Sequence, residues 1–142
     1  MQVPKNDTFK RIKQETFNSA KFSVAPNSNA VIEFGYQFEE DASLYFVLAH
    51  MHYRGTGYKI FHVGTDNKKT LLCNSPFYLL DKSVFFGGLP KNFQALKGSR
   101  IVVEIAYDNT TDNIVNPDPS VIIPQGLNPW DEEMAAAFIS FL

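Results

Sequence analysis

The sequence predicts an all-β fold, because short apolar segments with partial alternation recur along it and turn residues separate them. Its 142 residues are 44% hydrophobic and 14% aromatic, with thirteen phenylalanines, which is enough apolar material for the core of one domain. Gly, Pro and Asn bound the segments, as expected for strands joined by turns. This spacing is typical of a sandwich, a barrel or a jelly roll. Because no repeat or linker divides the chain, we expect a single domain.

The first part of the chain is polar and leads into a strand. Residues 1–20 are mixed in character, weakly helical or extended, and we expect an N-terminal extension or a first edge segment there. Residues 21–24 alternate between polar and apolar, and Pro26 to Asn29 predicts a turn. Residues 30–38 alternate imperfectly and predict a strand. Residues 39–41 are all acidic, and repulsion between their like charges favours exposure to solvent.

Further strands are expected at residues 44–52, 58–63, 69–73 and 99–107. Gly64 to Lys68 separates the second and third of these and predicts a hairpin. Residues 77–86 are aromatic and apolar and end at two glycines. Asp108 to Pro119, rich in Asn, Asp, Thr and Pro, predicts a long loop.

The C-terminal segment, residues 131–142, is compatible with two structures. Asp131 is a good helix N-cap, two glutamates suit a first turn, and three alanines favour a helix. The apolar residues 138–141 are equally compatible with a strand. Local propensity alone predicts the helix.

Composition excludes several classes of function. The net charge of −2 and the mixed distribution of charges give no footprint for nucleic acid or for an anionic membrane. No segment approaches the roughly eighteen apolar residues of a membrane span, and residues 1–7 have no signal-peptide core. Cys73 is the single cysteine, so an intrachain disulfide is excluded, and we expect a small buried apolar residue there. We find no Ser-His-Asp arrangement, phosphate loop or carboxylate pair that indicates hydrolysis or phosphoryl transfer.

His50 and His52 are the candidate functional residues. In a strand, alternate side chains leave on one face, so these two imidazoles would stand side by side, with backbones about 6–7 Å apart. That spacing allows both rings to bind one metal ion, while Met51 would point to the opposite face. The alternative is that both histidines lie on the solvated face of a half-buried strand. His62, the third histidine, has the pattern of a surface residue rather than a ligand.

Four motifs follow one another in one order: His50 to Gly55, Tyr107 to Thr110, Asn116 to Pro119, and Gly126 to Glu132. Together they resemble the C-terminal domain of the copper type II, ascorbate-dependent monooxygenases, the family of peptidylglycine α-hydroxylating monooxygenase. The resemblance runs from about residue 22 to residue 141. It implies an antiparallel jelly-roll β-sandwich over residues 21–142, with the C-terminal segment as a strand.

The resemblance also implies a copper site with two histidine ligands, which match His50 and His52, and one methionine ligand. Imidazole suits copper, and a thioether helps to hold Cu(I). In the family the methionine directly follows an Asp-Glu pair, whereas that position here is Glu133 and Met134 comes one residue later. A one-residue slip reverses the face of a strand. Either a bulge brings Met134 to the site, or Glu133 replaces the thioether, or the site is degenerate.

By this resemblance the chain is the oxygen-activating half of such an enzyme. Family members have a second copper domain with three more histidines, whereas this chain has three in total, so we expect no hydroxylation from it alone. A second copper domain, in cis or in trans, is the expected partner, and the resemblance suggests a secreted or periplasmic location. The alternative is a metal-free jelly roll used for binding or assembly. The sequence indicates neither a substrate nor an oligomeric state.

The other matched residues have structural interpretations. Asp108 and Asn109 are typical of a turn closed by side-chain-to-backbone hydrogen bonds. Trp130, the only tryptophan, is expected to be a core or loop anchor. Tyr107 either faces the site or packs in the core.

Overall fold

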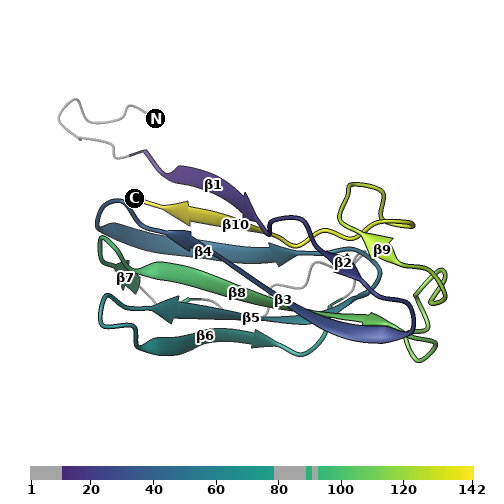
Figure 1. Ribbon diagram of the computed structural model, residues 1–142. Helices are drawn as coiled ribbons and strands as arrows, with labels where there is room; N and C mark the ends of the chain where they lie inside the picture. The colour runs from purple at the N-terminus through teal and green to yellow at the C-terminus, as the bar shows by residue number, and fades with distance from the viewer. Residues whose placement is uncertain (1–10, 79–88, 91–92) are drawn as a thin grey trace, which may run out of the picture.

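The strands form two facing antiparallel sheets in an open sandwich (Figure 1). The computed structural model describes residues 11–78, 89–90 and 93–142, and this part of the chain contains strands but no helix. The β4 sheet has the order β1 (Lys13–Asn18), β10 (Ala136–Phe141), β4 (Ala42–His50), β7 (Phe93–Ala95). The β8 sheet has the order β3 (Ser28–Gln37), β8 (Arg100–Asn109), β5 (Gly55–Val63), β6 (Lys69–Ser75). A short pair, β2 (Ser23–Val24) and β9 (Ile123–Pro124), completes the set, and the prediction of an all-β fold is confirmed.

The core lies between the two sheets. On β8, Ile101, Val103 and Ile105 alternate toward it and are fully buried. From the β4 sheet, Ala49 and Ile139 face them at 1% exposure each. This alternation is what a strand buried on one face requires, and each such aliphatic side chain contributes about 1.5–3 kcal/mol by leaving water.

The C-terminal segment is a strand, as the resemblance implied, and the helix that local propensity predicts is not formed. β10 is an interior strand, because it pairs with β1 on one side and with β4 on the other. Both ladders satisfy its backbone groups, which outweighs the few tenths of a kcal/mol per residue by which alanine favours a helix. The small side chains of Ala136 and Ala137 are buried in the sheet.

A tight turn joins the two sheets beside the predicted metal site. β4 ends at His50, β5 begins at Gly55, and the Gly55 N–H donates to the His52 carbonyl at 3.2 Å. A Cβ at Gly55 would overlap the Met51 side chain, so this position requires glycine. The turn therefore fixes where the histidines leave the sheet.

Two of the sequence predictions can be compared with the structure only in part, because some residues lie outside the described ranges. Of the apolar segment at residues 77–86, residues 79–86 lie outside the described residues. The described residues include no helix long and apolar enough to cross a membrane.

Candidate metal centre

The two histidines at the end of β4 stand next to each other. The ring centroids of His50 and His52 are 5.5 Å apart and the rings are nearly perpendicular, at 82°. Met51 between them is fully buried in the core, whereas His50 is partly exposed. The two rings are therefore neighbours, as the alternation predicted. His52 is only 5% exposed, so the alternative in which both histidines lie on a solvated face is wrong.

The His52 ring is held in one orientation by the segment before β10. Its Nδ1 lies 2.9 Å from the carbonyl oxygen of Glu132. A carbonyl can only accept a hydrogen bond, so Nδ1 carries a proton, and in the neutral ring it is Nε2 that has the free electron pair. A backbone carbonyl on the other ring nitrogen is the usual way in which proteins orient a metal-binding histidine.

His50 is also suited to the neutral state that a ligand needs. Burial lowers the pKa of His50, and the neighbouring His52 lowers it further. The ring of Phe138 lies 6.4 Å from the His50 ring and forms part of its apolar surroundings. Both effects favour the neutral His50 imidazole, the form that can donate an electron pair to a metal ion.

Glu133 is buried beside the histidine turn and binds its backbone. It is fully buried, and its two carboxylate oxygens accept hydrogen bonds from the backbone N–H groups of His52, at 2.8 Å, and Arg54, at 2.6 Å. Burial raises the pKa of Glu133 to about 7, although these backbone bonds oppose the shift. With both oxygens engaged by the backbone, we assign the Glu133 side chain a structural role in place of the ligand role that the sequence left open.

Met134 lies two residues before β10, the strand that pairs with the histidine-bearing end of β4. It is partly exposed, while Glu133 and Ala135 on either side of it are fully buried. Ala136 pairs with His50, and the same register continued by two residues would place Met134 opposite His52. Among the described residues, no three His, Cys, Asp or Glu side chains are grouped closely enough to hold a metal ion.

Arg54 is a central residue of the site that the sequence analysis missed. Its side chain is 1% exposed, with Nε donating to Asn116 Oδ1 at 3.0 Å and a terminal nitrogen donating to the Trp130 carbonyl at 2.6 Å. Burial lowers the pKa of Arg54, and the charge of Glu133 opposes this. Its position at the end of an apolar run, before a glycine, was the available signal. Arg54 ties two of the four matched motifs to the histidine turn.

The structure places the remaining predicted residues as follows. His62, expected at the surface, is partly exposed on β5, with its ring 5.0 Å from that of Phe93. It belongs to the β8 sheet, whereas the histidine pair belongs to the β4 sheet. Cys73 is buried as predicted, and burial raises the pKa of its thiol.

The matched loop residues have largely the structural roles that the sequence suggested. Asp108 accepts from the Thr110 N–H at 2.9 Å, and Asn109 donates to two backbone carbonyls, as predicted for turn residues. Trp130 is 56% exposed and stacks on Tyr53 at 4.7 Å, so its ring is not in the core. Tyr107 is a core residue, 1% exposed.

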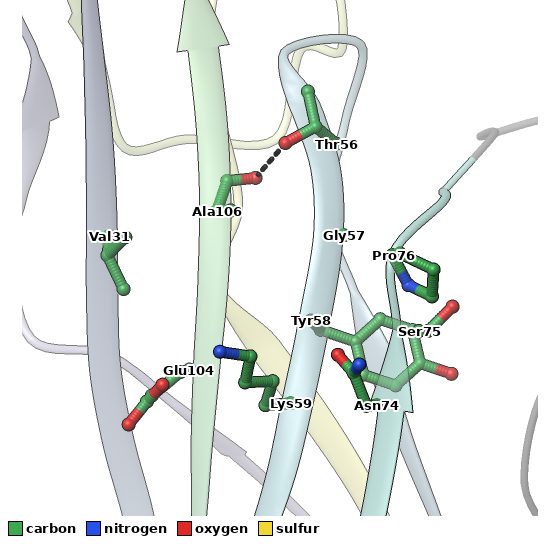
Figure 2. Close-up of a pocket in the computed structure, with 10 residues that line it drawn as sticks. All are labelled: Val31, Thr56, Gly57, Tyr58, Lys59, Asn74, Ser75, Pro76, Glu104 and Ala106. Carbon is green, nitrogen blue, oxygen red and sulfur yellow. Dashed lines mark hydrogen bonds between the residues drawn. The ribbon is translucent and has the colours of Figure 1, made fainter.

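A hollow on the described surface lies elsewhere, on the β8 sheet (Figure 2). It holds about 240 Å³ and is lined by residues of β3, β8, β5 and β6, including Val31, Thr56 and Glu104. Some of its polar groups already bind other protein groups. Thr56 donates to the Ala106 carbonyl at 3.2 Å (Figure 2), and Glu104 forms a salt bridge with Lys69 at 2.6 Å. Neither histidine of the pair lines it, so this hollow and the candidate metal centre are separate features.

The arrangement at the end of β4 brings together side chains of types that bind transition metals. It contains two adjacent imidazoles, one of them held in orientation by a carbonyl, and a methionine on the neighbouring segment. Imidazole with thioether is a donor set that suits copper, whereas oxygen-only sites suit Mg²⁺ and Ca²⁺. In comparisons with known proteins, no family model and no curated protein matched this chain.

Proposed function

We propose that this chain is a copper-binding jelly-roll domain related to the oxygen-activating half of the ascorbate-dependent copper monooxygenases. The observation that carries the proposal is the pair of adjacent histidine rings, 5.5 Å apart, with the His52 ring oriented by the Glu132 carbonyl. The order of the four matched motifs supports the relationship. The antiparallel sandwich is compatible with a jelly roll.

The proposed ligands are His50, His52 and Met134. They come from two neighbouring segments, the end of β4 and the residues just before β10. Copper bound in this way would supply redox chemistry and oxygen activation. A second copper domain, in cis or in trans, is the proposed electron source, so we expect no ascorbate-dependent hydroxylation from the domain alone.

Titration with copper tests the histidine ligands. The domain should bind about one copper ion, and the double variant His50→Ala, His52→Ala should bind none at the same site. His62→Ala is the matched control and should keep the binding, because His62 lies in the β8 sheet. Wild-type affinity in the double variant would overturn the assignment.

X-ray absorption on the Cu(I) form tests the third ligand. The wild type should show a sulfur scatterer, and Met134→Leu should remove it and weaken Cu(I) binding by about 10- to 100-fold, equal to about 1–3 kcal/mol. Met51→Leu is the control, since Met51 is fully buried on the opposite face. A wild-type spectrum without sulfur would argue against the oxygen-activating role.

The second candidate function is a metal-free binding or assembly module. It is favoured by apolar side chains exposed near the histidine turn, with Trp130 at 56% and Leu127 at 79% exposure. Large exposed apolar groups of this kind are common at protein interaction sites. A wild-type domain that takes up no copper at micromolar concentrations would favour this function.

A further inference from the structure

The β4–β10 ladder ends before the proposed ligands are reached. The last pair of this register is His50 with Ala136, so His52 and Met134 lie beyond the regular hydrogen bonds between the two strands. A site whose ligands come from two segments needs both held at a fixed separation. Other interactions therefore have to hold the two segments together here, as the hydrogen bonds of the ladder do elsewhere in the sheet.

Three buried or partly buried side chains supply hydrogen bonds to the backbone at this point. Glu133 accepts from the His52 and Arg54 N–H groups. The Tyr78 hydroxyl donates to the Met51 carbonyl at 2.8 Å and lies 3.4 Å from the Met51 nitrogen. It therefore binds the backbone of the residue between the two histidines. The Tyr107 hydroxyl donates to the Met134 carbonyl at 2.6 Å. The segment that carries the histidines and the segment that carries Met134 are thus each bound by one tyrosine hydroxyl.

We propose that Tyr107 and Tyr78 are positioning residues of the metal centre, Tyr107 for the Met134 thioether and Tyr78 for the His50 and His52 imidazoles. The inference rests on the proposed function, because it concerns the same copper site. Neither phenol is proposed to touch the metal. Each acts through the backbone of the segment that carries the ligand.

The geometry of Tyr107 makes this role specific. It is 1% exposed, and its ring packs against that of Phe22 at 5.6 Å, so the ring itself is fixed by the core. Burial raises the pKa of Tyr107, so the hydroxyl keeps its proton and remains a donor. Tyr107→Phe would preserve the ring packing and remove one hydrogen bond, which leaves the Met134 carbonyl free to move.

The two phenols should have different effects on the two copper states. A thioether stabilises mainly Cu(I), whereas imidazole binds both Cu(I) and Cu(II). Loosening Met134 should therefore weaken Cu(I) binding selectively. Loosening Met51, between the histidines, should weaken the binding of both states.

The test measures Cu(I) and Cu(II) dissociation constants by chelator competition, together with the reduction potential, in the full chain. Tyr107→Phe should weaken Cu(I) binding by about 10-fold, the lower end of the range for partners of metal ligands, and leave Cu(II) binding within about twofold. The reduction potential should then fall by about 59 mV, the equivalent of a tenfold change for one electron. Tyr78→Phe should weaken both states and shift the potential little.

Tyr58→Phe is the matched control. Tyr58 is also a core phenol, 6% exposed, but its hydroxyl bonds the Ser75 side chain and neither ligand segment. It should lose stability without a change in either copper constant. Far-UV circular dichroism checks that each variant folds. If Tyr107→Phe does not fold, Tyr78→Phe provides an independent test of the positioning role.

Each outcome separates the inference from the proposed function. If the wild type binds copper and Tyr107→Phe has the same two constants and the same potential, the positioning role is wrong and the copper site stands. If Tyr58→Phe changes the two copper dissociation constants as much as Tyr107→Phe does, the effect comes from general destabilisation of the core. The positioning role is then again wrong. If the wild type binds no copper, the proposed function fails and the inference fails with it.

Discussion

Two adjacent glutamates near the histidine turn have opposite environments. Glu132 is partly exposed and its carboxylate accepts from the Asn128 N–H at 2.9 Å, closing a surface loop. Glu133 is fully buried and binds the backbone of the turn. Although the two side chains are chemically identical, only the second supports the candidate metal centre.

Removing Glu133 should therefore be costly. Glu133→Ala leaves the buried N–H groups of His52 and Arg54 without an acceptor, and we expect a loss of about 2–4 kcal/mol in the free energy of unfolding. Glu132→Ala should lose about 1 kcal/mol or less, because water can replace its bond. Urea denaturation of both variants measures the difference. Equal losses would show that the buried carboxylate does not hold the turn.

The sequence was sufficient to find the histidine pair but not its supports. The alternation of His50 and His52 is local, because it depends only on the two-residue period of a strand. The partners of Glu133 lie 81 and 79 residues away along the chain, so no local pattern could indicate them. A buried arginine is also rare enough that Arg54 would normally be assigned to the surface.

At the scale of elements, β10 shows how sheet context overrides local preference. Most of its side chains are buried, as expected for an interior strand, and only Phe138 is exposed, at 40%, beside Ile139 at 1%. Neighbouring side chains of a strand point to opposite faces, so this contrast can be tested by substitution.

Ile139→Ala should cost about 2–4 kcal/mol of stability, as for other large-to-small changes in a packed core. Phe138→Ala should cost about 1 kcal/mol or less, because its ring is already partly in water. Thermal and urea unfolding of the two variants give the comparison. A larger loss for Phe138→Ala than for Ile139→Ala would contradict the orientation of β10.

Long strands were predicted better than short ones. The hairpin of β5 and β6 and the strand β8 occur close to where the pattern placed them, since their turns and alternation are local signals. β7 and β9, with three and two residues, were not anticipated. Strands this short have too few residues for a period of two to be seen, and the pairing with distant strands creates them.

At the scale of the whole molecule, the loops at the histidine end are joined to the sandwich. Arg54 bonds Asn116 in one loop and the Trp130 carbonyl in another. The fold class followed from composition and turn spacing, but the order of strands in each sheet did not, because it depends on contacts between remote segments. Only the resemblance gave a topology before the structure was known.

This linkage predicts a single unfolding transition. Trp130 fluorescence reports on a loop, and far-UV circular dichroism reports on the sheets, yet both should give the same urea midpoint because Arg54 couples them. In Arg54→Ala, we expect the fluorescence midpoint to fall below the circular dichroism midpoint. Coincident midpoints in the variant would show that other contacts hold the loop.

The place of β10 has a consequence for biosynthesis. This strand is the last of those in the described residues, yet it lies between β1 and β4, so the two earlier strands have no common neighbour until residue 141 has left the ribosome. Until then the edge of β4 that pairs with β10 stays open and is available to other nascent chains. Holding chaperones should therefore bind stalled chains that lack β10 and release them once this strand is made.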